Sequence, residues 1–257
     1  HDITPTSDHR LEPFGKKVPT LVNDLASSHY LKAVDWWKAW RQWRTEQPPF
    51  VAVIGLHSSG SSCLAGVLHH LGVHMGNKLV GHYGDDPETS CGFEAQGLAH
   101  VCEQAIERFS TRHGDIAHAA WQLSNWVSQR QLEAMQAGTI AGGKYPYLCQ
   151  LQRVLELVAS NGLRVAFADR PIKDSITSLQ RRFPDIPEKV ERHQRWLAAG
   201  KEAFRQSGVP SVSIDFYDLL HHPRKQIGRL ATFLGMDPSP DQVSKAINSV
   251  RPEKRSV

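Results

Sequence analysis

Residues 51–63, with the sequence VAVIGLHSSGSSC, join an apolar run to a loop of small and hydroxyl-bearing residues. The apolar run predicts a buried strand, and the apolar pattern that resumes after the loop predicts a helix. Small side chains let the backbone approach an anion closely, and the first N–H groups of a helix lack partners within that helix. The helix dipole adds about half a positive charge there. We therefore expect a phosphate or sulfate group to be held by Ser58, Ser59, Gly60, Ser61 and Ser62.

The spacing of Gly55 and Gly60 matches the phosphate loop of nucleoside triphosphatases, G-x-x-x-x-G-K-[ST]. In those enzymes a lysine after the second glycine contacts the outer phosphates. Ser61 stands at that position here, so the loop lacks the cation and ATP hydrolysis is disfavoured. A glycine-serine turn without a ligand is the alternative interpretation of this segment.

A second strand-to-helix segment covers residues 163–182, LRVAFADRPIKDSITSLQRR. Arg170 follows its apolar run, and Asp174 and Ser178 come four and eight residues later. This spacing resembles the sulfotransferase segment R-x-x-x-D-x-x-x-S, in which the Arg and Ser hold the 3′-phosphate of the sulfate donor. An ion pair between Arg170 and Asp174 is the alternative interpretation.

Other segments in the same order strengthen this resemblance, which covers about residues 50–236. The loop GLHSSGSS at 55–62 resembles the sulfotransferase loop for the 5′-phosphosulfate, commonly G-x-[HP]-[RK]-S-G-T-[ST]. Residues 92–94, GFE, resemble the G-[FY]-[FW]-E turn of bacterial members. Residues 214–223, IDFYDLLHHP, are similar to the strand-to-helix segment Y-E-D-L-x-x-x-P.

The resemblance implies transfer of a sulfuryl group from 3′-phosphoadenosine 5′-phosphosulfate (PAPS) to an acceptor hydroxyl or amine, without a metal. The acceptor would be a carbohydrate or another small molecule; histidine- and tryptophan-bearing segments favour a polar ring such as a sugar. The fold implied is a three-layer, P-loop-like α/β fold, with a central parallel sheet covered by helices on both faces.

Ser58 departs from the family pattern, because relatives carry a cation there that reaches the oxygen bridging phosphate and sulfate. Loss of one such stabilising group costs on the order of 3 kcal/mol, by analogy with oxyanion-hole deletions. Lys144, in the segment GGKYP, resembles the family's [IV]-K-[DY]-P segment and is the best substitute; a solvated loop lysine is the alternative. Because Ser58 replaces the cation, a second possible function is a sulfotransferase homologue that binds the nucleotide with weakened catalysis. A P-loop kinase is a third possible function, and Ser61 in place of lysine disfavours it.

A base must take the proton from the acceptor. Glu94, in the family's G-F-E turn, is the first candidate, with a surface glutamate as the alternative. His57 and His82 are second candidates, since imidazole titrates near neutral pH.

Composition is consistent with an enzyme that binds small anionic ligands. The chain has 257 residues and a formal net charge of +4, with basic residues too scattered for a nucleic-acid partner. No apolar run approaches the 18 residues of a membrane span. The four cysteines show no C-x-x-C spacing, so a reducing, cytoplasmic location is the default expectation.

We expect two regions, an N-terminal extension over 1–48 and a sulfotransferase-like domain over 49–257. The extension combines a polar arm with a helix over about 21–44, in which Trp36, Trp40 and Trp43 share one face. That face predicts packing on the core, with a homodimer contact or an acceptor-binding wall as alternatives. Strands alternating with helices predict a parallel sheet, whose ligands bind at the carboxyl ends of the strands. The expected strands are 51–54, 139–142, 163–169 and 211–215. A helix is expected over 187–207, and residues 77–93, rich in glycine and aspartate, are expected to be irregular. Residues 249–255 form a basic tail.

Overall fold

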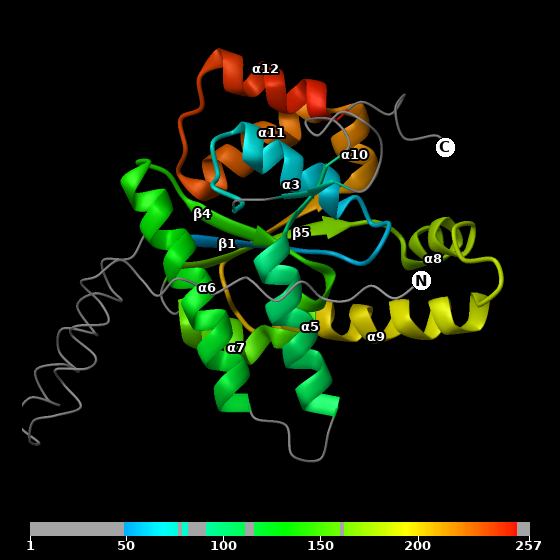
Figure 1. Cartoon of the computed structure of the whole chain (residues 1–257). Helices are drawn as coiled ribbons and strands as arrows, with labels where there is room; N and C mark the ends of the chain where they lie inside the picture. The colour runs from blue at the N-terminus through cyan, green and yellow to red at the C-terminus, as the bar shows by residue number, and fades with distance from the viewer. Residues whose placement is uncertain (1–48, 77–78, 82–90, 111–115, 160–161, 251–257) are drawn as a thin grey trace, which may run out of the picture. The chain divides into compact units, whose positions relative to one another are not determined.

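The computed structural model describes residues 49–76, 79–81, 91–110, 116–159 and 162–250 (Figure 1). The predicted arm and tryptophan-bearing helix over 1–48 lie outside the described residues. So do His82, most of the segment 77–93, and the basic C-terminal tail.

Four parallel strands form the central sheet, in the order β4(Ala141–Lys144), β1(Phe50–Ile54), β5(Leu163–Asp169), β6(Ser211–Asp215). The predicted parallel α/β sheet is therefore confirmed. Because all four strands run the same way, their carboxyl ends meet at one edge. Gly55, Lys144, Arg170 and Phe216 are at or directly after these ends.

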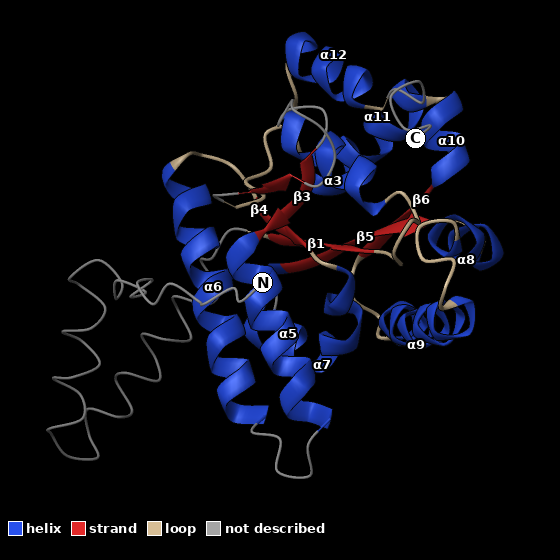
Figure 2. Ribbon diagram, turned by 45° about the vertical axis from the view of Figure 1, so that its right-hand side comes forward, coloured by secondary structure: helices blue, strands red, loops and turns tan. Residues whose placement is uncertain are grey.

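Helices cover both faces of the sheet, as the alternating side chains of β1 require. Phe50, Ala52 and Ile54 enter one hydrophobic core, whereas Val51 and Val53 enter another, and all five are fully buried. The first core contains residues of α5(Gln96–Ser110), α6(Ile116–Gln136), α7(Gln152–Ala159) and α9(Pro187–Gln206). The second contains residues of α3(Ser61–His70), α11(Pro223–Leu234) and α12(Pro240–Ser249). Figures 1 and 2 show these two groups of helices on opposite sides of the strands.

A small second sheet corrects the expectation of an irregular segment over 77–93. β2(Leu79–Gly81) pairs antiparallel with β3(Cys91–Ala95), so that Val80 lies opposite Glu94. The two strands are short and contain glycine, so they show no strand periodicity in the sequence. Pairing with each other, and packing of β3 on α3, define them.

The remaining elements follow the carboxyl ends of the strands. β4 leads into a 3-10 helix, η1(Pro146–Leu151), and β5 leads into α8(Ile172–Gln180). β6 leads directly into α10(Phe216–His221), whose N-cap Asp215 accepts hydrogen bonds from the backbone N–H groups of Tyr217 and Asp218. This cap fixes the backbone of the two aromatic residues that follow β6.

Candidate active site

The loop after β1 folds tightly on itself. The Ser59 hydroxyl and backbone N–H both donate to the Leu56 carbonyl, at 2.8 and 3.2 Å. Gly55 faces this turn, because a Cβ there would lie 2.6 Å from Ser59 Oγ. The structure thus commits both donors of Ser59 to the loop itself, so this residue shapes the loop rather than offering a donor to a ligand.

No side chain caps the N-terminus of α3. Gly60 is the N-cap, with φ +87° and no side-chain hydrogen bond to the cap. The first N–H groups of α3, from Ser61 onward, have no carbonyl within the helix to bind. The ring of Phe216 lies directly against Gly60, since a Cβ there would be 2.8 Å from the ring's Cε2. Gly60 therefore provides both the left-handed turn and the space for the aromatic ring.

Ser58 has a left-handed backbone, with φ +58°, which is uncommon for a residue other than glycine. Its buried Oγ has no hydrogen-bond partner among the described residues. Its carbonyl accepts a hydrogen bond of 2.8 Å from Arg170 Nη1. At the position where the sulfotransferase loop pattern has a cation, this chain therefore has a hydroxyl without a partner among the described residues.

Arg170 connects the loop to the end of β6. Its guanidinium lies 4.9 Å from the ring centroid of Phe216 and 5.7 Å from that of Tyr217. Its buried Nε has no partner among the described residues. Asp174 accepts instead from the Tyr217 hydroxyl, at 2.8 Å. The described ion pairs do not include one between Arg170 and Asp174, which removes the main alternative interpretation of this arginine.

Lys144 and Glu94 meet at the phosphate loop, although 50 residues separate them in the sequence. Lys144 is 3% exposed, and its ammonium donates to Ser62 Oγ at 3.1 Å and to the Gly92 carbonyl at 3.3 Å. It also forms an ion pair with Glu94. The structure therefore places a buried cation against the loop that carries none of its own, and Lys144 is not a solvated lysine.

The neighbouring Phe93 anchors the part of β3 that contains Glu94. Its backbone is left-handed, with φ +51°, and its ring packs on Gly66 of α3, where a Cβ would lie 2.8 Å away. The ring is also 5.4 Å from that of His69. Glu94 is consequently positioned by packing between β3 and α3, and it is not a surface glutamate, because its side chain is 13% exposed.

His57 does not titrate near neutral pH as the sequence suggested. Burial is the largest cause that lowers the pKa of His57 to about 4, and the neighbouring His193 and Lys144 lower it further. The ring is therefore neutral at pH 7 and is a weak base. The buried Gln194 donates to the His57 carbonyl at 2.7 Å, which fixes the backbone just before Ser58.

Ser178 was predicted to bind the donor nucleotide together with Arg170. The contacts of the described residues do not connect it to Arg170 or to the loop after β1. It is partly exposed in the second half of α8. Phe216, Tyr217 and Gln194 were not predicted from the sequence as site residues, although they contact Arg170 or the loop after β1. The aromatic pair was visible as FY directly after the strand 211–215, within a segment already matched to the family, but its contact with Arg170 depends on the pairing of β5 with β6.

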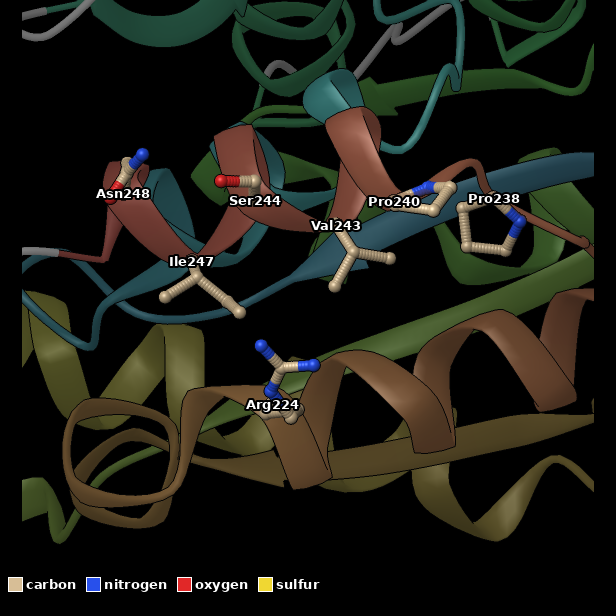
Figure 3. Close-up of a pocket in the computed structure, with 7 residues that line it drawn as sticks. All are labelled: Arg224, Pro238, Pro240, Val243, Ser244, Ile247 and Asn248. Carbon is tan, nitrogen blue, oxygen red and sulfur yellow. The ribbon is translucent and has the colours of Figure 1, made fainter.

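A pocket of about 470 Å³ lies elsewhere, between α11 and α12 (Figure 3). None of the predicted site residues lines it; the lining residues are Arg224, Pro238, Pro240, Val243, Ser244, Ile247 and Asn248. Within the described ranges, no group of three His, Cys, Asp or Glu residues is arranged to hold a metal ion. No described helix combines the length and apolarity that a membrane crossing needs.

No family model matches this sequence, and no curated protein matches it significantly. Solved structures do resemble it. Sulfotransferase STF9 from Mycobacterium avium aligns with a TM-score of 0.53 at 10% identity, over 79% of this chain and 67% of STF9. Sulfotransferase STF1 from Mycobacterium tuberculosis H37Rv aligns with a TM-score of 0.50 at 16% identity, over 82% of this chain and 74% of STF1. The sulfotransferase domain of the Synechococcus PCC 7002 olefin synthase aligns with a TM-score of 0.45 at 17% identity, over 80% and 81%. The alignments with STF9 and STF1 show that the described residues adopt the sulfotransferase fold.

Proposed function

We propose that the chain transfers a sulfuryl group from PAPS to a hydroxyl or amine of a carbohydrate or other small-molecule acceptor. The observation that carries this proposal is the buried Lys144, whose ammonium is hydrogen-bonded to Ser62 in the first turn of α3, a helix end that no side chain caps. A cation beside main-chain N–H groups suits a doubly anionic phosphosulfate. We assign this activity to residues 49–257, with 1–48 as an extension.

The residues present fit the two ends of this donor. The N–H groups after Gly60 and the hydroxyls of Ser61 and Ser62 would hold the 5′-phosphosulfate, and the orphan hydroxyl of Ser58 supplies one more donor. Arg170 would hold the 3′-phosphate through the guanidinium N–H groups that do not bind the Ser58 carbonyl. Ser178 would join it there, as the family resemblance implies.

Lys144 and Glu94 would perform the two chemical tasks. Transfer breaks the bond between sulfur and the bridging oxygen, and forms a bond between sulfur and the acceptor oxygen. Lys144 places positive charge where the bridging oxygen becomes negative, and this preorganised charge lowers the barrier. Glu94, paired with Lys144, accepts the proton that the acceptor hydroxyl loses.

Transfer of radiolabelled sulfate from PAPS to a panel of sugar, phenol and peptide acceptors tests this function. Calorimetry with 3′-phosphoadenosine 5′-phosphate (PAP) and with ATP tests the site separately. We expect PAP to bind more tightly than ATP and label to appear in at least one acceptor class. PAP binding without transfer would favour the weakened homologue that Ser58 suggests, and tighter binding of ATP would favour a kinase.

A further inference from the structure

Four partly exposed rings form a continuous cluster beside the phosphate loop. Tyr147 comes from η1, His193 and Trp196 from α9, and His57 from the loop after β1. The ring centroids of His57 and His193 are 5.4 Å apart, those of His193 and Trp196 5.6 Å, and those of Tyr147 and Trp196 5.8 Å. We call these four residues the ring cluster.

The ring cluster adjoins the residues assigned to chemistry. His57 directly precedes the orphan hydroxyl of Ser58. Tyr145 directly follows Lys144, and its ring lies 5.4 Å from that of Tyr147. The Tyr145 hydroxyl donates to Glu103, so this ring is held in place and closes the cluster toward Lys144.

Two glutamine side chains donate hydrogen bonds to backbone carbonyls of the ring cluster. Gln194 is fully buried and binds the His57 carbonyl through Nε2, while its Oε1 has no partner among the described residues. Gln150 Nε2 donates to the Trp196 carbonyl at 2.8 Å. Trp196 remains 39% exposed, and its ring contacts those of Tyr147 and His193.

The charge state of the two histidines in the ring cluster determines which ligands suit it. Burial and neighbouring cations lower the pKa of both His57 and His193, so both imidazoles are neutral at pH 7. The charged groups that influence these rings are Lys144, Glu94, Arg182 and Lys189. Neutral imidazole accepts a hydrogen bond from a hydroxyl, and aromatic faces stack on the apolar face of a ring.

We propose that the ring cluster is the acceptor-binding surface, and that it takes an uncharged, hydroxylated ring compound stacked on the exposed ring of Trp196. This inference rests on the proposed function. Its ligand lies next to Glu94 and Lys144, where a hydroxyl of the ring meets the base and the sulfuryl group. A sugar and a phenol share this chemistry, and the experiment separates them.

Ligand-observed NMR titration of the full chain with saturating PAP tests the surface with four probes. Methyl β-D-glucopyranoside and 2-naphthol are the uncharged sugar and phenol; methyl β-D-glucuronide and 2-naphthoate are their anionic counterparts. We expect one uncharged probe to bind more tightly than its anionic counterpart. Trp196→Ala should weaken that binding about three- to tenfold, the range of one lost aromatic contact. PAP affinity and the thermal midpoint should stay near wild type.

Trp121→Ala is the matched control, because Trp121 is 60% exposed on α6 and is not part of the cluster. It should leave all probe affinities unchanged. The acceptor assignment fails if neither uncharged probe binds, if the anionic probes bind equally well, or if Trp196→Ala behaves like the control while PAP binding is intact. Failure of PAP to bind the wild-type chain would instead overturn the proposed function, and the acceptor assignment with it.

Discussion

Lys144 brings an ammonium to the loop after β1, which carries no cation of its own, from a different element. In nucleoside triphosphatases the loop itself carries the lysine, after the second glycine. Here Ser58 and Ser61 are hydroxyl residues, and the ammonium arrives from the carboxyl end of the neighbouring strand β4. The Glu94 carboxylate compensates for the burial of that ammonium, which would be costly alone. The pair therefore places an ammonium and a carboxylate together at the loop.

Replacement of Lys144 by Met should reduce turnover about 10²- to 10³-fold, the usual effect of removing one group that stabilises developing charge. Sulfate transfer at saturating PAPS measures this loss. The variant also leaves Glu94 without its ammonium partner, so the protein should unfold more easily, by roughly 3–5 kcal/mol.

Lys201→Met controls for that loss of stability. Lys201 is also buried, at 9% exposure, and forms an ion pair with Asp169, but it does not contact the loop. It should destabilise the fold comparably and keep most of the turnover per folded molecule. Equal losses of turnover in the two variants would contradict a chemical role for Lys144.

Arg170→Gln should weaken PAP binding about 10- to 100-fold, because a charge-assisted hydrogen bond contributes about 1.5–3 kcal/mol. If Arg170 holds the 3′-phosphate, binding of AMP, which lacks that group, should change little. Calorimetry with both nucleotides measures the difference. Arg195→Gln is the control, since Arg195 is 65% exposed and pairs with Glu191. Equal weakening of PAP and AMP would show that Arg170 only supports the loop through Ser58.

At the scale of elements, the loop after β1 and the start of α10 form one unit. The Phe216 ring packs on Gly60 on one side and on the Arg170 guanidinium on the other. The ends of β1, β5 and β6 are therefore coupled through a single aromatic ring. A shift of that ring disturbs the N-terminus of α3 and the arginine together.

Gly60→Ala tests this coupling. The new methyl group would overlap the ring of Phe216, and alanine also disfavours φ +87°. We expect PAP affinity to fall at least tenfold, as measured by calorimetry. Gly208→Ala is the matched control: its φ is +76°, but no atom lies within 4 Å of the added Cβ. That variant should lose only about 1 kcal/mol of stability and bind PAP normally. Normal PAP binding by Gly60→Ala would show that the ring is free to move aside.

The sequence predicted the elements with their own periodicity and misplaced those that depend on neighbours. The strands 163–169 and 211–215 and the helix at 187–207 agree with β5, β6 and α9 within one residue. β4 lies at 141–144, whereas the prediction was 139–142. The predicted strand ended too early because Gly142 and Gly143 are typical of a loop. Their missing side chains make room for Val73, Met75, Leu98 and Trp126, a contact that only the tertiary structure reveals.

The same limit applies to the site. Glycine and serine content identified the loop, and spacing identified Arg170, since each pattern is local in the sequence. The pairing of Lys144 with Glu94 could be suggested only through the family resemblance, because the two residues belong to different sheets. The neutral state of His57 could not be predicted, because it follows from burial against η1 and α9.

At the scale of the whole molecule, buried titratable groups should make the fold sensitive to acid. The pKa of His57 is lowered to about 4, and those of Asp169 and Glu133 are lowered as well. Lys201 and Arg205 hold the Asp169 carboxyl in its charged form, and Gln129, His74 and Arg130 do so for Glu133. In each case the unfolded chain binds protons more readily than the folded chain, so the free energy of unfolding falls as the pH falls.

The histidine contribution can be separated by its pH window. His57 has an unfolded pKa of 6.5, so its contribution is intact above pH 6.5 and is lost as the pH falls toward 4. The shift corresponds to about 3 kcal/mol at most. The pKa of His193 is lowered in the same direction, so the variant His57→Gln/His193→Gln should lose less stability between pH 6.5 and 4.5 than the wild type does. Urea unfolding at closely spaced pH values measures this difference. The two carboxylates contribute mainly below that window, because their unfolded pKa values are 3.8 and 4.5. If both proteins lost stability in parallel across this pH window, the two histidines of the ring cluster would not be held neutral by the fold.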